Sequence, residues 1–159
     1  TDIFPGDKGC IGIWCTYETL ASWDSLMGYG DSSNHFKIEM NDSNQLYAVF
    51  YLENTDGFIT TPGNVVLVAG KWYWVVCRWD IPNDRLDLSV NGLTAIGTET
   101  TLYSWSFGGD CNIYFGSKYD GITNTYIFIG RAFISKDPNT PEILTAFGKH
   151  LHLPLIDKQ

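Results

Sequence analysis

The sequence has little charge, a shortage of basic residues and no long apolar run. Only 18% of its 159 residues are charged, and 18 acidic against 10 basic side chains give a formal net charge of −8. No basic stripe interrupts this balance, which argues against nucleic acid or an anionic membrane surface as a partner. The longest apolar runs, such as Val65 to Ala69, are far too short to be inserted across a bilayer.

Familiar catalytic motifs are missing as well. Acid/base cleavage of a glycosidic bond needs two carboxylates beside one bond, yet no Glu-x-Asp or Asp-x-Glu pair occurs in the chain. Glu39 and Asp42 are three apart across a predicted turn, and we expect both to be solvated. There is no Gly-x-Ser-x-Gly, no His-Glu-x-x-His and no phosphate-binding loop. These absences favour a protein that is not an enzyme.

The four cysteines contain no Cys-x-x-Cys pair, which argues against a zinc site. Cys10 and Cys15 fall on opposite faces of a predicted strand and should not bridge each other. Cys15 and Cys77 share strand faces with apolar residues, so we expect buried thiols in the core. At least one disulfide among the four cysteines is the alternative, and two disulfides could form in three ways.

Aromatic residues make up 15% of the sequence, and it contains sixteen glycines. Few segments have helical periodicity. This composition predicts one packed all-β domain over residues 1–159. The sequence opens on Thr1, which is compatible with a piece of a longer protein. Strands are predicted over residues 10–17, 26–29, 35–40, 45–52, 58–61, 65–68, 71–80, 85–90, 93–96, 101–103, 112–116 and 125–134, and a short helix over 140–147.

The stretch from Lys71 to Leu93 gives the clearest local prediction. Residues 71–80 are aromatic and β-branched with almost no polar residue, as in a strand covered on both faces. Residues 81–84 contain a proline-led turn, and residues 85–90 alternate apolar and polar side chains. Asn91-Gly92 then predicts a tight turn, because both residues tolerate a positive φ.

This pattern resembles the laminin-G-like branch of the concanavalin A-like jelly rolls over roughly residues 9 to 147. The resemblance rests on the segments GCIGIWCT (9–16), LMGYG (26–30), GKWYWVVCRWD (70–80), LDLSVNG (86–92) and NIYFGS (112–117). It implies a two-sheet antiparallel sandwich with one short C-terminal helix. The acidic residue common on the family's closing strand is replaced here by Phe128 and Ile129. We expect that face to be buried against another chain or domain.

Aromatic residues near predicted loops are the candidates for ligand binding, because flat rings stack on sugars. They are Trp23, Tyr29, Tyr103, Trp105 and Tyr119. The alternative is that these rings close the ends of the sandwich. Trp14, Trp72, Trp74 and Trp79 lie within predicted strands and are expected in the core.

The resemblance also implies a calcium site, because members that bind calcium do so through loop carboxylates and carbonyls. Residues in comparable places are Asp31, Asn34 and Asp110. Ordinary use of Asp and Asn in turns is the alternative.

Two classes of function follow. The first is a non-catalytic recognition module that binds a glycan or a surface protein, in an extracellular, virion-surface or cell-surface setting. The second is a structural module of a virion fibre, decoration protein or adhesin that associates with copies of itself. A polysaccharide hydrolase or lyase is the third and weakest reading.

Overall fold

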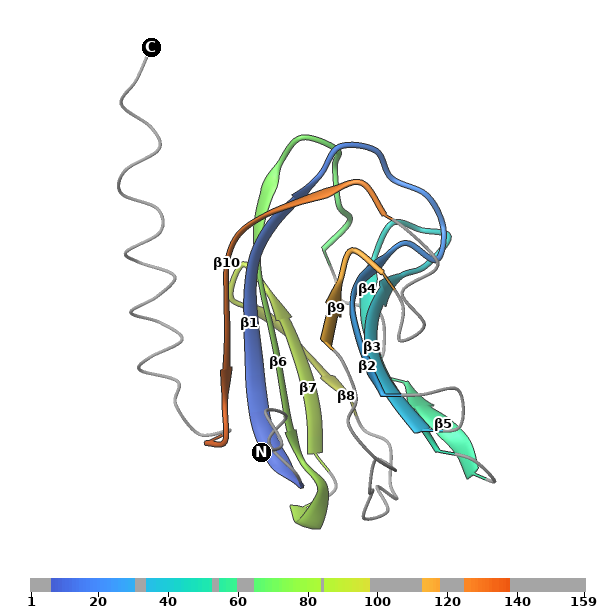
Figure 1. Cartoon of the computed structure of the whole chain (residues 1–159), viewed down its shortest axis with the longest axis vertical. Coiled ribbons are helices and arrows are strands. Elements are labelled where there is room, and N and C mark those ends of the chain that lie inside the picture. Colours follow the sequence, from blue (N-terminus) through green and yellow to red (C-terminus); the bar gives the residue numbers. More distant parts are fainter. Residues whose placement is uncertain are drawn as a thin grey trace.

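The computed structural model describes residues 7–30, 34–52, 55–59, 65–83, 85–97, 113–117 and 125–137. Within these ranges the chain forms two five-stranded antiparallel sheets packed face to face (Figure 1). The predicted all-β, two-sheet antiparallel sandwich is therefore confirmed. The helix predicted over 140–147 and the strand over 101–103 lie outside the described residues.

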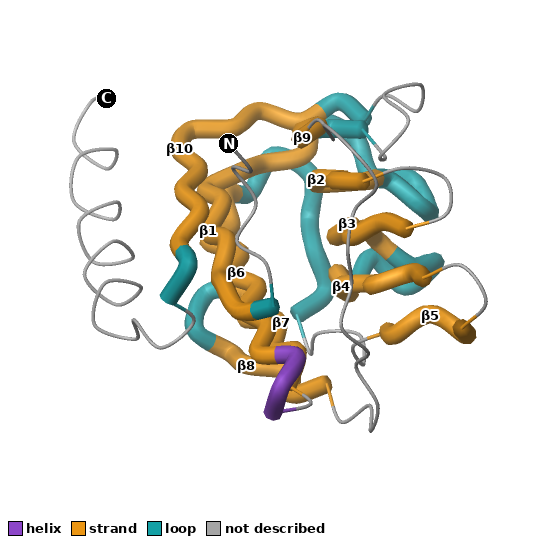
Figure 2. The backbone as a smooth tube through the Cα atoms, turned by 60° about the horizontal axis from the view of Figure 1, so that its bottom comes forward, coloured by secondary structure: helices purple, strands orange, loops and turns teal. Residues whose placement is uncertain are grey.

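Within the described residues, the strands follow one another along the chain with one short helix. Their bounds are β1 Lys8–Tyr17, β2 Ser25–Gly30, β3 Asn34–Met40, β4 Leu46–Leu52, β5 Thr55–Ile59, β6 Trp72–Asp80, η1 Ile81–Asn83, β7 Arg85–Val90, β8 Leu93–Gly97, β9 Ile113–Phe115 and β10 Ile127–Ser135. We call the sheet of order β10-β1-β6-β7-β8 sheet A and that of order β5-β4-β3-β2-β9 sheet B. Figure 2 shows the two layers side by side, with sheet A on the left.

Two predicted strands differ from the structure. The strand predicted from residue 58 begins at Thr55, because the pairing of β4 with β5 extends to Leu52 opposite Thr55. The strand predicted over residues 65–68 is reduced to one bridge between Val66 and Gln45. Both differences depend on which strands pair side by side, and the local amino-acid composition does not indicate that pairing.

The predicted hairpin is confirmed as β6, η1 and β7, with Asp80 opposite Arg85. Asn91 and Gly92 have φ values of 52° and 83°, as the tight turn into β8 requires. Oδ1 of Asn91 also accepts a hydrogen bond from the backbone N–H of Trp74 at 2.8 Å. This bond joins the turn between β7 and β8 to the neighbouring strand β6.

The core lies between the sheets and takes alternate residues from the strands of both. Phe36 of sheet B packs 4.6 Å from Phe50 and 5.6 Å from Trp79 of sheet A, measured between ring centroids. Cys15 and Cys77 are free thiols in this core, as predicted. Burial raises the pKa of Cys15 to about 12, so it stays protonated and inert.

A second apolar cluster covers the outer face of sheet A. It contains Trp14, Trp74 and Val76, with Phe133 packed against them. Trp79 is in the main core as predicted, but Trp72 is not, since 38% of its surface is exposed. It begins β6 on the outward side and stacks on Trp14 at 5.7 Å.

The closing strand β10 is partly exposed in the single chain. Ile129 packs against the core, but 59% of the surface of Phe128 is exposed. Strand alternation directs the two side chains to opposite faces, so only one of them reaches the core of this chain. Burial of Phe128 against another chain or domain stays a prediction.

Candidate functional site

The outer face of sheet B gathers polar and aromatic side chains from adjacent strands. Phe36, Ile38 and Met40 of β3 point into the core, so the residues between them point outward. Antiparallel pairing places each opposite an outward residue of β4, in the pairs His35–Tyr51, Lys37–Val49 and Glu39–Tyr47. The strands of sheet B bow toward sheet A, which leaves this outer face as their concave side (Figure 1).

Glu39 is the centre of the face and is only 2% exposed. Its Oε1 lies 2.8 Å from Nζ of Lys37 and accepts a hydrogen bond from the hydroxyl of Tyr47. Within the described part of the chain, its Oε2 is buried without a hydrogen-bond partner. The expectation that Glu39 is solvated is wrong, because tyrosine and lysine side chains enclose it on the sheet.

The hydroxyl of Tyr47 acts as a hydrogen-bond donor to Glu39. Burial raises its pKa well above the ordinary value, and the hydrogen bond to Glu39 and the negative charges of Glu39 and Asp42 raise it further. The phenol therefore stays protonated and keeps Glu39 in place. Glu39 in turn fixes the ammonium of Lys37, whose side chain is mostly buried. The three side chains form one rigid unit.

Trp23 borders this unit at one end. Its ring is 52% exposed and meets Tyr47 edge-on at 6.5 Å. The residue has a φ of 70°, which is unusual for a bulky side chain. Its backbone N–H donates to the carbonyl of Met40 at 2.8 Å, and Oδ2 of Asp24 accepts from the N–H of Ala21 at 2.9 Å. These bonds hold the loop that presents the ring.

Tyr51 borders the other end of the face and is 40% exposed. Its ring stacks on His35 with 4.9 Å between centroids and 18° between planes. Tyr51 lies four residues after Tyr47 along the extended strand, a distance of about 13 Å. Two accessible rings therefore flank the Lys37–Glu39–Tyr47 unit along one strand direction.

The predicted ligand-binding residues have different outcomes. Trp23 is exposed in the loop before β2, whereas Tyr29 is buried in the core, so we leave Tyr29 out of the site proposed below. Tyr103, Trp105 and Tyr119 lie outside the described residues.

Of the predicted calcium ligands, Asn34 begins β3 and is half-buried, while Asp31 and Asp110 lie outside the described residues. No three His, Cys, Asp or Glu side chains are grouped for a metal ion in the described ranges. Calcium at these positions stays a prediction from the resemblance. Likewise, no helix in the described ranges has the length and hydropathy to cross a membrane.

Sequence reasoning missed Lys37, Glu39, Tyr47 and Tyr51 as members of a site. Alternation along β3 indicated which of its residues face outward. It could not indicate that tyrosines of β4 pair with them, because register across two strands is a tertiary property.

Comparison with known proteins settles the family. The model of the concanavalin A-like lectin/glucanases superfamily matches residues 2–131. The chain belongs to this superfamily. No curated protein matches it. Members of the superfamily share the sandwich, but their sites differ, so membership fixes the fold and leaves the ligand open.

Solved structures of low identity agree with this superfamily's fold. The carbohydrate-binding module CBM40 of the Ruminococcus gnavus IT-sialidase superimposes with a TM-score of 0.69 at 18% identity, covering 91% of this chain and 84% of that one. A pentraxin of Limulus polyphemus gives 0.64 at 11%, covering 90% and 70%. Domains LG4-5 of the mouse laminin alpha1 chain give 0.62 at 12%, covering 86% and 37%. Each shares the sandwich fold with this chain.

Proposed function

We propose that this domain is a non-catalytic carbohydrate-recognition module that binds a glycan across the outer face of sheet B. The observation that carries the proposal is the placement of two accessible rings, Trp23 and Tyr51, on either side of the Lys37–Glu39–Tyr47 unit. Aromatic faces stack on the apolar sides of sugar rings, and fixed polar groups hold their hydroxyls. Extended strands supply a rigid platform for both.

The similar proteins support this reading. One related structure is the CBM40 module bound to alpha2,3 sialyllactose, and another is bound to alpha2,6 sialyllactose. These are modules attached to a sialidase, and sialidases also occur among the similar structures. We place the present chain with the binding modules, because it covers 84% of the CBM40 chain but only 24% and 23% of the two sialidase chains. Such a module would act outside the cell or on a cell or virion surface.

A glycan array followed by calorimetry tests the proposal. The wild-type domain should bind at least one class of glycan, and Trp23→Ala should weaken that binding by about tenfold or more. Trp72→Ala is the matched control, because it removes another partly exposed tryptophan, on sheet A. It should leave affinity unchanged. Equal losses in both variants, or no binding to any glycan, would overturn the proposal.

We also propose further ligand contacts at Tyr103, Trp105 and Tyr119. We propose in addition that calcium bound at Asp31, Asn34 and Asp110 is part of the site. Affinity for the glycan identified above should fall in Trp105→Ala, and in wild-type protein after dialysis against EDTA, if these predictions hold. Unchanged affinity in either experiment would remove that component from the proposal.

Self-association as a structural module is a second candidate. The observation that favours it is apolar exposure at β10, where Tyr126 and Phe128 are both open to solvent. β10 also ends sheet A in the described part of the chain. Light scattering should show a mass that grows with concentration and returns to that of a monomer in Phe128→Glu. A constant monomer mass for the wild type would exclude this candidate.

A further inference from the structure

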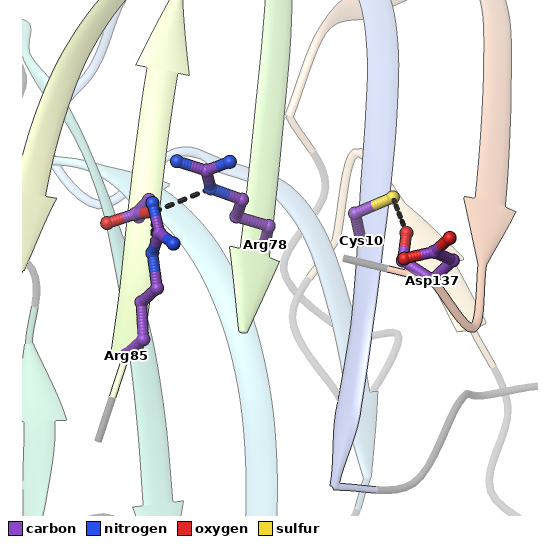
Figure 3. Close-up of polar contacts among 5 residues, drawn as sticks. Cys10, Arg78, Arg85 and Asp137 are labelled. Carbon is purple, nitrogen blue, oxygen red and sulfur yellow. Dashed lines mark hydrogen bonds and ion pairs between the residues drawn. The ribbon is translucent and has the colours of Figure 1, made fainter. Parts of the chain in front are cut away.

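The arginines of this chain are absent from the face that we assign to the glycan. The sequence contains three, Arg78, Arg85 and Arg131, and they lie on β6, β7 and β10 of sheet A. Nε of Arg78 and Nε of Arg85 each lie 2.6 Å from Oδ2 of Asp87 (Figure 3). Arg131 lies opposite Trp14 in the pairing of β10 with β1. The side chain best shaped to hold a carboxylate in two parallel hydrogen bonds is thus confined to the other sheet.

Lys37 is a cation on the outer face of sheet B, but its charge is already neutralised. Its Nζ lies 2.8 Å from Oε1 of Glu39, and Glu39 is almost completely buried. Turning the ammonium toward a ligand anion would leave a buried carboxylate without its counter-ion, which is strongly unfavourable. The pair therefore offers an N–H donor to a sugar hydroxyl more readily than a charge to a sugar carboxylate.

Among the described residues, the neighbours in register with this pair add no positive charge. In register with Lys37 are Val49 on β4 and Gly28 on β2, and Gly28 lies opposite Tyr114 on β9. Tyr51 is uncharged and stacks on His35. The net charge of −8 adds a weak repulsion of anions over the whole surface.

We infer that this face selects uncharged oligosaccharides, and that a carboxylate on the sugar does not improve binding. The inference rests on the proposed function and gives its ligand a chemical class. It separates this chain from the CBM40 module of the Ruminococcus gnavus sialidase, whose structures hold alpha2,3 and alpha2,6 sialyllactose. Stacking and hydroxyl hydrogen bonds supply the affinity, with no ion pair between protein and glycan.

The experiment compares neutral oligosaccharides with their sialylated counterparts, including lactose and alpha2,3 sialyllactose, by array and calorimetry at about pH 8, where imidazole is ordinarily neutral. The expected result is that each sialylated glycan binds no more tightly than its neutral parent. We also expect Kd for the best neutral glycan to change by less than about twofold between about 0.05 and 0.5 M NaCl.

Two results would count against these ideas, and they can be told apart. Sialylated glycans that bind more than about threefold tighter than their neutral parents would overturn the inference and leave the recognition module standing. Absence of binding to every glycan on the array would overturn the proposed function itself, and this inference with it.

Discussion

Nζ of Lys37 lies 2.8 Å from Oε1 of Glu39, two residues further along the same face of β3. The carboxylate is buried under its neighbours, and Tyr47 donates a hydrogen bond to the same oxygen. A charge in this position can be tolerated only with its counter-ion in place. This makes the pair a structural feature of the proposed binding face as well as a polar contact on it.

Lys37→Met should therefore lower the free energy of unfolding by about 3 kcal/mol, because it leaves Glu39 buried and unpaired. Urea denaturation measures this change. The double variant Lys37→Met/Glu39→Gln removes both charges and should recover most of the loss. Single and double variants of equal stability would show that the ion pair is not what holds this part of the sheet.

Tyr51→Ala should weaken glycan binding by about tenfold, because it removes an accessible ring at one end of the face. Tyr51→Phe keeps the ring and is the matched control, with affinity expected within about threefold of wild type. Calorimetry against the best glycan from the array gives both values. A Tyr51→Phe variant as weak as Tyr51→Ala would shift the contact from the ring to its hydroxyl.

Cys15 and Cys77 should resist alkylation in the folded protein. Burial raises the pKa of Cys15 to about 12, and burial together with the nearby Asp87 and Cys10 raises that of Cys77 well above its ordinary value. Only the thiolate reacts, so at pH 8 about one molecule in ten thousand carries a reactive Cys15 even before access is considered. Iodoacetamide labelling read by peptide mass spectrometry should mark both residues in urea and neither without it.

Rapid labelling of Cys15 under native conditions would mean that β1 opens frequently. Cys10 is a useful comparison, since it is also buried but its Sγ donates to the carbonyl of Asp137 at 3.4 Å at the end of β10 (Figure 3). Labelling that appears at Cys10 before Cys15 would place the first opening at this end of the strand.

The ion pair between Lys8 and Asp80 should make stability depend on pH in the acid range. Burial alone would raise the pKa of Asp80, but hydrogen bonds from Asn83 and Lys8 and the charge of Lys8 outweigh it and hold that pKa below its ordinary value. A carboxyl with a depressed pKa stabilises the fold above the pKa of the unfolded chain, about 3.9, and that stability is lost as pH falls through the folded value.

Wild type should therefore be more stable than Asp80→Asn near pH 7, and the difference should shrink as pH falls below about 4. Urea denaturation across this range provides the measurement. Lys8→Met should show a reduced pH dependence of the same sign, because it removes the partner 3.1 Å from Oδ1 of Asp80. A gap between wild type and Asp80→Asn that persists at low pH would assign the effect to packing.

Much of the fold could be predicted because its signals are local. Alternation of apolar residues located most strands, and Asn91-Gly92 located a turn through its need for positive φ. The exposure of Trp72, and that of Phe128 in the single chain, could not be predicted in this way. Both depend on which face of a strand is covered by another part of the molecule, and an aromatic side chain does not carry that information.

The site was predictable only in part, for a related reason. Trp23 stood out as an aromatic residue between strands, where loops present their side chains to solvent. Glu39 was expected in water because acidic residues usually are. Its burial follows from the register of β3 with β4, which places Tyr47 opposite, and no spacing within β3 encodes that partner.

The position of β1 within sheet A has a consequence for how the chain folds. β1 lies between β6 and β10, and Cys10 pairs with Arg78 and with Ser135, which are 68 (78 − 10) and 125 (135 − 10) residues away. Contacts this distant in sequence form slowly, because closing long loops costs entropy before any contact is gained. β1 must wait until β10 has been synthesised, so we expect refolding in milliseconds to seconds and a dependence of biosynthetic yield on chaperones that shield β1 until then.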